Sequence, residues 1–189
     1  MTREEALKIL KKHVKSEQLY RHSLAVEAAM ISYAKYFEED VEYWGNLGLL
    51  HDVDFEKYPE KHPLMAPELL ETENVDQDFI DAIVSHGDGK ESMRTDKMRK
   101  TLSAVDQMSS FIVAIALMRP TKLEGLSTKS VKKKMKDKAF AKAVDRAYLE
   151  ETRNDLGVEF ADHVDIIVKG LMNQEKRLIE EGFSLLSNK

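Results

Sequence analysis

The residues best suited to chemistry in this chain are two neighbours, His51 and Asp52, at the end of an apolar run that includes Leu49 and Leu50. A neutral imidazole and a carboxylate are both ligands that first-row metals accept in proteins. A helix that ends at this pair can aim both side chains at one point, because adjacent positions diverge by about 100° and the last turn can relax. The dipeptide alone occurs by chance in many chains, so its meaning depends on partners elsewhere.

Three further histidines occupy positions from which they could reach such a site. His22 lies on the apolar stripe of a helix expected over about 17–37, where an unpaired polar group is costly. A histidine there is either a hydrogen-bonded core residue or a ligand, and its own helix does not decide between them. His62 precedes Pro63 in a charged loop, and His86 stands directly before a glycine that signals the end of a helix.

Asp106 lies within the most apolar helix expected in the chain, over about 95–118. An ionised carboxylate in such a helix needs a cation close by, because burying an unpaired charge is expensive. A metal would meet this need, and so would an internal salt bridge to Arg99 or Arg119. The helix by itself leaves the two interpretations open.

The elements that must position these residues are helices. The chain has 189 residues with 42% hydrophobic and 33% charged composition, which is about one globular domain. Few glycines and prolines and a helical period throughout predict an all-α fold, with Thr2 and Asp40 as N-caps of early helices. Two late helices are expected over about 139–155 and 159–181, with His163 on the surface of the second.

Composition also excludes several functions. Without cysteine the chain forms no disulfide, zinc-thiolate site or iron–sulfur cluster, and it has no cysteine nucleophile. A net charge of −5 argues against a nucleic-acid polymer as partner. No stretch is long and apolar enough for a membrane span, and the N-terminus lacks a signal peptide, which predicts a cytoplasmic protein. The basic run 129–138 is a solvated face or a local phosphate-attracting patch.

In chain order, the candidates read H…HD…H…H…D, and this pattern on an all-helical chain resembles the HD superfamily of metal-dependent phosphohydrolases. Stretches from Trp44 to Glu56 and from the Asp106 helix through Pro120 are similar to a small group of predicted HD hydrolases. The resemblance implies an HD-domain helical bundle over 1–189, with a core over about 16–120 and a C-terminal helical extension over about 121–189 packed on it. It implies four ligands of a primary metal, His22, His51, Asp52 and Asp106. Members with a second metal add two histidines, which here match His62 and His86, with Asp52 as the bridge.

This ligand set predicts hydrolysis of a phosphoester in a small metabolite, most naturally a nucleotide. One or two divalent transition metals (Fe, Mn, Co or Ni, with Mg or Zn as alternatives) would lower the pKa of a bound water and produce hydroxide for attack on phosphorus. Asp54 and Glu56, just beyond the pair, are the candidate proton-transfer residues. The candidates for holding the charge of a phosphorylated substrate are Lys61, Arg119, Lys122, Lys132 and Lys133.

The chain departs from the pattern of many two-metal members in two places. Val53-Asp54-Phe55 follows the pair where Ile-Gly-Lys is common, which removes a usual phosphate contact, and His86 is not doubled. The Gly-Tyr-Pro motif of the cyclic-dinucleotide phosphodiesterases is also absent. Two other functions stay open. The same six ligands hold a di-iron pair in oxygenases of the superfamily, and a ligand-sensing module could keep the fold without turnover.

Overall fold

The computed structural model describes residues 1–73 and 75–187, and within them the chain is all-α, as the sequence predicts. The helices are α1 Arg3–His13, α2 Glu17–Phe37, α3 Val41–Leu50, α4 Ala66–Leu70, α5 Gln77–Ser85, the 3-10 turn η1 Glu91–Met93, α6 Lys97–Leu117, α7 Thr128–Met135, α8 Arg146–Leu156 and α9 Phe160–Glu180. None of the helices described is long and apolar enough to cross a membrane.

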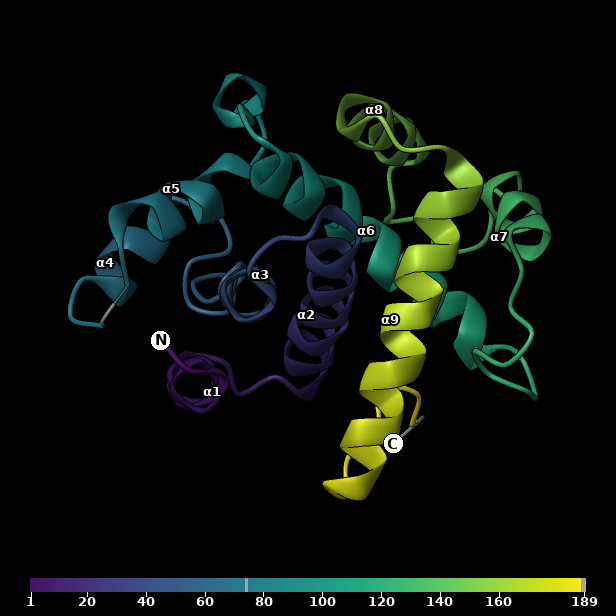
Figure 1. The fold of residues 1–189 in the computed structure, drawn as a ribbon, viewed down its shortest axis with the longest axis horizontal. Coiled ribbons are helices and arrows are strands. Elements are labelled where there is room, and N and C mark those ends of the chain that lie inside the picture. The colour runs from purple at the N-terminus through teal and green to yellow at the C-terminus, as the bar shows by residue number, and fades with distance from the viewer. Residues whose placement is uncertain (74, 188–189) are drawn as a thin grey trace.

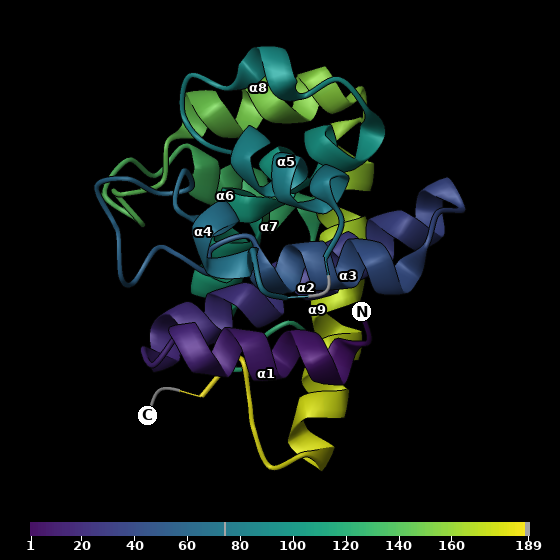
Figure 2. The same cartoon turned by 90° about the vertical axis from the view of Figure 1, so that its left-hand side faces the viewer.

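Helix α2 is the centre of the molecule. It packs against α3 on one side, against α9 on another and against α6, which crosses behind it (Figure 1). Helices α1 and α3 lie next to each other across one face, as the turned view shows (Figure 2). The central helix therefore carries His22 into a position where α3 and α6 can both reach it.

Side-chain caps determine where most of the helices begin. Each cap accepts a hydrogen bond from a backbone N–H in the first turn, which satisfies donors that have no partner within the helix. The capping residues are Thr2, Ser16, Asp40, Asp76, Asp96, Ser127 and Asp145. Thr2 also forms the reciprocal capping box with Glu5, and Asp40 begins α3, so both predicted caps are confirmed.

A buried carboxylate that the sequence analysis did not single out joins three helices. Glu27 of α2 is fully buried and accepts hydrogen bonds from Arg3 of α1 and from Gln174 and Arg177 of α9. The distance from Gln174 Nε2 to Glu27 Oε2 is 2.6 Å. These partners compensate a charge that would otherwise be costly in the interior, and they hold α1 and α9 against the central helix.

The prediction of one helix over 139–155 was wrong at its start. Residues 138–144 form turns and a bend, and α8 begins only at Arg146 because Asp145 accepts the backbone N–H groups of Ala147 and Tyr148. The Arg146 guanidinium donates to the carbonyls of Phe140, Ala141 and Val144, so the turns have their own hydrogen bonds. The apolar periodicity continues across these turns, which is why the sequence pattern suggested a single helix.

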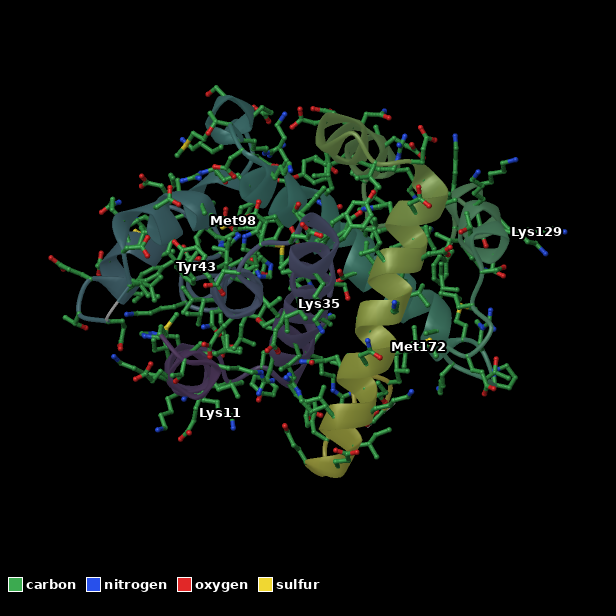
Figure 3. The ribbon with its side chains drawn as sticks, viewed as in Figure 1. Lys11, Lys35, Tyr43, Met98, Lys129 and Met172 are labelled. Atoms are coloured by element: carbon green, nitrogen blue, oxygen red, sulfur yellow. The ribbon has the colours of Figure 1, made fainter. Side chains whose placement is uncertain are left out.

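The basic run lies on the outer side of the molecule. Most of it belongs to α7 and the turn that follows, and Lys129 projects outward from α7 (Figure 3). Lys132 lies over the ring of Phe160, and Lys134 pairs with Asp137 at 3.0 Å. Two of these lysines therefore have local partners within this outer region.

Candidate metal centre

His51 and Asp52 stand at the C-terminal end of α3, and the close packing of α3 on α2 sets their depth. His51 is completely buried and Asp52 nearly so. The two helices approach so closely at Gly48 that a Cβ there would lie 2.9 Å from the carbonyl oxygen of Val26. This contact brings the His51 ring against His22, with the two Nε2 atoms 3.1 Å apart.

Asp106 of α6 closes the first half of the site. Its Oδ1 lies 3.0 Å from Nε2 of His22 and 3.5 Å from Nε2 of His51. Neither arginine that could have formed an internal salt bridge does so, because Arg99 pairs with Asp78 and Asp96, and Arg119 donates to Thr121 and the Glu124 carbonyl. The partly buried carboxylate of Asp106 therefore faces histidines, and the arginine alternative is wrong.

His62 and His86 form the second half. Their Nε2 atoms lie 3.1 Å apart, and Oδ1 of Asp52 lies 3.2 Å from Nε2 of His62 and 3.6 Å from Nε2 of His86. The loop that carries His62 fits against the end of α5 because Gly87 has no side chain. A Cβ at Gly87 would lie 2.5 Å from Cδ of Pro63.

Asp52 lies between the two halves. One carboxylate oxygen, Oδ2, is 3.3 Å from Nε2 of His22, while the other faces His62, His86 and His51. Two groups of side chains here could each hold a metal ion, with all ligand atoms of a group within 4.8 Å of one another. These groups are His22 with His51 and Asp106, and His51 with Asp52 and His86. His62 belongs to neither group, although its ring nitrogen touches that of His86.

The opposite ring nitrogens show why a cation fits between these histidines. Nδ1 of His51 donates to the Gly48 carbonyl at 2.8 Å, and Nδ1 of His86 donates to the Ile83 carbonyl, each three residues back along its helix. Nδ1 of His62 donates to Asp54 at 2.7 Å. With Nδ1 carrying the hydrogen, Nε2 of each neutral ring is a bare lone pair aimed at the other ligands. Such lone pairs repel one another and Asp52 unless a positive charge lies among them.

The electrostatics of the cluster agree with this conclusion. Burial by itself lowers the pKa of His22, but hydrogen bonds and charge from Asp106 and Asp52 outweigh it and raise the pKa to about 10. Burial likewise lowers the pKa of His62, and Asp52 and Asp54 raise it to about 9. Burial would raise the pKa of Asp52, yet the neighbouring histidines hold it well below its usual range. The site therefore attracts positive charge, which bound protons supply when no metal does.

Asp54 and Glu56, the candidate proton-transfer residues, have different surroundings. Asp54 is completely buried, and its carboxylate accepts from Nδ1 of His62 and from the backbone N–H of Met65 at 3.1 Å. This geometry suits a residue that orients a ligand. Glu56 is exposed and lines a cleft beside the site, where it accepts from the backbone N–H groups of Lys15 and Ser16.

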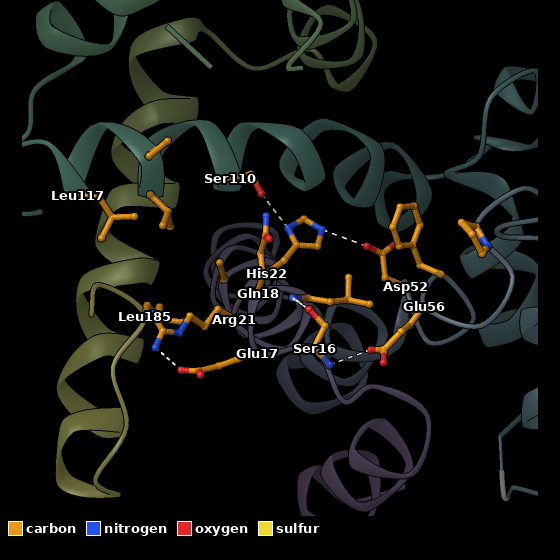
Figure 4. Close-up of a pocket in the computed structure, with 16 residues that line it drawn as sticks. Ser16, Glu17, Gln18, Arg21, His22, Asp52, Glu56, Ser110, Leu117 and Leu185 are labelled. Carbon is orange, nitrogen blue, oxygen red and sulfur yellow. Dashed lines mark hydrogen bonds and ion pairs between the residues drawn. The ribbon is translucent and has the colours of Figure 1, made fainter. Parts of the chain in front are cut away.

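The cleft has a volume of about 860 Å³ and opens onto His22 and Asp52. In Figure 4, His22 lies in the middle of the drawn residues and Asp52 at one side, while Leu117 and Leu185 lie at the other side. Ser110 also lines the cleft, and its hydroxyl oxygen is 2.8 Å from Nδ1 of His22. The sequence analysis missed Ser110, although its position four residues after Asp106 places both on the same face of α6.

The five cationic residues expected to bind substrate do not line this cleft. Lys122 donates to the Leu117 carbonyl at 3.3 Å, and Lys61 is exposed. Arg119 has the partners described above, and the exposed Lys132 and Lys133 belong to α7. The structure thus brings together the six candidate ligands, and none of the five candidate cations lines the cleft that opens onto them.

His163, expected on the surface of α9, is instead completely buried, so that expectation was wrong. Its Nδ1 accepts a hydrogen bond from the hydroxyl of Tyr33 on α2. A signal was present in the sequence, because His163 precedes Ile167 by four residues and so lies on the apolar stripe of its helix. It is far along the chain from the six candidate ligands and contacts none of them in the hydrogen bonds described.

No family model, curated protein or solved structure matches this chain.

Proposed function

We propose that this protein is a metal-dependent phosphohydrolase of the HD type that acts on a phosphoester of a small metabolite. The observation that carries the proposal is the convergence of four imidazole Nε2 atoms and two carboxylates, with the Nδ1 atoms of His51, His62 and His86 tied to fixed acceptors. The chain order of these ligands is the order that the resemblance to HD phosphohydrolases implies.

The residues divide into two ligand sets that share one carboxylate. His22, His51, Asp52 and Asp106 would hold one divalent ion, and His62 and His86 would hold a second together with Asp52. Divalent ions at such a site lower the pKa of a bound water towards 7 and neutralise phosphate oxygens. Donors of this kind suit Fe, Mn, Co or Ni, which accept imidazole and carboxylate together.

Other residues of the chain prepare the site for this role. Asp54 holds the His62 ring in the orientation that aims Nε2 inward, and Ser110 contacts the His22 ring in the same way. Burial of His51, Asp52 and His86 limits water around the candidate ligands and strengthens their interaction with charge. Glu56, which lines the cleft, would exchange a proton with solvent or with a leaving oxygen.

The test combines metal analysis with a phosphate assay. Protein purified without chelator is analysed for metals, and phosphate release is measured from phosphomonoesters and nucleotides with Mn, Co, Ni, Mg or Fe added. We expect bound metal and phosphate release, and we expect His51→Ala to lose both while His13→Ala keeps both. Full metal content and rate in His51→Ala would refute the site assignment. Two iron atoms per chain with no phosphate release under any metal would refute hydrolysis and favour oxygenation.

A further inference from the structure

The walls of the cleft beside the candidate metal centre are largely apolar. Side chains from α2, the loop after α3, α6 and the segment after α9 contribute to them, including Leu19, Phe55, Pro59, Val113, Leu117 and Leu185. Phe55 is 44% exposed, and its ring stands edge-on to His62 with 5.1 Å between centroids. An exposed aromatic ring next to a candidate ligand offers a surface for an apolar group held close to that ligand.

Apart from a metal at the candidate centre, the cleft offers little positive charge. Arg21 is the one lysine or arginine among the described residues that line it, and its guanidinium is already paired with Glu17 and donates to the Ser187 carbonyl. Glu17 and Glu56 add two carboxylates to the same lining. A second or third phosphate of a substrate would therefore meet apolar, neutral polar or negative side chains and one arginine that is already paired, instead of the several free cations that phosphate chains require.

We infer that the site takes a phosphomonoester whose body is an apolar alkyl or aryl group, and that it discriminates against nucleoside di- and triphosphates. The inference rests on the proposed function, because the single phosphate would sit at the candidate metal centre while the body lies along the apolar walls. Recognition is divided in two: a metal held at His22 and Asp52 would bind the phosphate, and the apolar walls of the cleft would bind the apolar body.

Binding of non-hydrolysable phosphonates tests the inference without relying on turnover. Titration calorimetry on the manganese-loaded protein compares methyl-, butyl-, octyl- and naphthylmethylphosphonate with inorganic phosphate and with ADP. We expect the Kd to fall by about fourfold for each buried methylene until the cleft is filled. We expect ADP to bind more weakly than octylphosphonate. A Kd that does not change with the length of the alkyl group, or tighter binding of ADP, would overturn the inference.

Two variants locate the binding. Ala114→Trp places a large ring in the cleft wall on α6, and Ile179→Trp places the same ring on an exposed part of α9 outside the cleft. We expect Ala114→Trp to weaken the binding of octylphosphonate at least tenfold while leaving the binding of inorganic phosphate and the metal content unchanged. We expect Ile179→Trp to change none of these three quantities. Equal effects of the two variants would overturn the inference. So would a dimer, detected by sedimentation, that only Ala114→Trp disrupts, because a second copy would then occupy the cleft.

Two other measurements distinguish a failure of the proposed function from a failure of this inference. Protein that takes up no metal in elemental analysis refutes the metal centre itself. A protein that takes up metal and releases phosphate would support the proposed function. If that protein nevertheless prefers short polar esters or nucleoside triphosphates, the inference of an apolar substrate is refuted.

Discussion

Lowering the pH from about 7 to about 4.5 should destabilise this protein through His163, a buried ring between α9 and α2. Burial, with a smaller effect from the charge of Arg153, lowers the pKa of His163 from 6.5 to about 4. Above pH 6.5 the ring is neutral in both folded and unfolded protein and contributes nothing to the pH dependence. Below 6.5 the unfolded chain binds the proton first, so stability falls until the folded ring titrates near pH 4.

The size of the effect follows from the difference between the two pKa values. Each unit of difference corresponds to about 1.4 kcal/mol, so the free energy of unfolding should fall by at most about 3 kcal/mol across this range. His22 and His62 act in the opposite direction over the upper part of this range. Their rings stay protonated in the folded metal-free protein while the unfolded chain takes up the same protons only as the pH falls through 6.5, so they add a smaller gain in stability. This gain is common to the wild type and to a variant that lacks only the His163 ring, so the difference between the two proteins reports His163.

Urea unfolding at about pH 7 and about pH 4.5, followed by circular dichroism on metal-free protein, measures the effect. His163→Gln is the matched variant, because glutamine can still accept a hydrogen bond from the Tyr33 hydroxyl but does not titrate. We expect the variant to lose less stability than the wild type between the two pH values, by about 2 kcal/mol. An equal loss in both proteins would refute the assignment of a buried, neutral His163.

Two further predictions concern the candidate metal centre and the helix contact that builds it. Asp54→Asn keeps the shape of the side chain but removes the carboxylate that holds Nδ1 of His62, and we expect metal affinity to fall about 10- to 100-fold in a manganese titration; unchanged affinity would show that Asp54 does not orient a ligand. Gly48→Ala should lower the free energy of unfolding by about 1–3 kcal/mol despite the better helix propensity of alanine, because the new Cβ meets the Val26 carbonyl and the Met30 side chain. Thermal unfolding measures this change, and a stabilised variant would contradict the close packing of α3 on α2.

The positions of most helices were predictable because they depend on local interactions. Thr2 and Asp40 satisfy backbone donors within the next few residues, and apolar spacing of three and four residues describes one face of one helix. The same local reasoning failed between 137 and 145, where Asp137 and Asp145 each bind nearby backbone N–H groups and turns replace a helix. Two short capping interactions there outweighed a continuous apolar pattern.

By itself, the sequence determined the all-α class and supplied the six candidate ligand residues in a recognisable order. Only the tertiary structure decided how they meet, because the Nε2 atoms of His22 and His51 approach through a contact at Gly48, and His62 reaches His86 through the space left at Gly87. It also decided that the walls of the cleft are largely apolar and that the expected cations do not line it. These features depend on contacts between segments far apart in the chain. The free energy of these contacts comes from close packing, which cannot be predicted from a local pattern of residues.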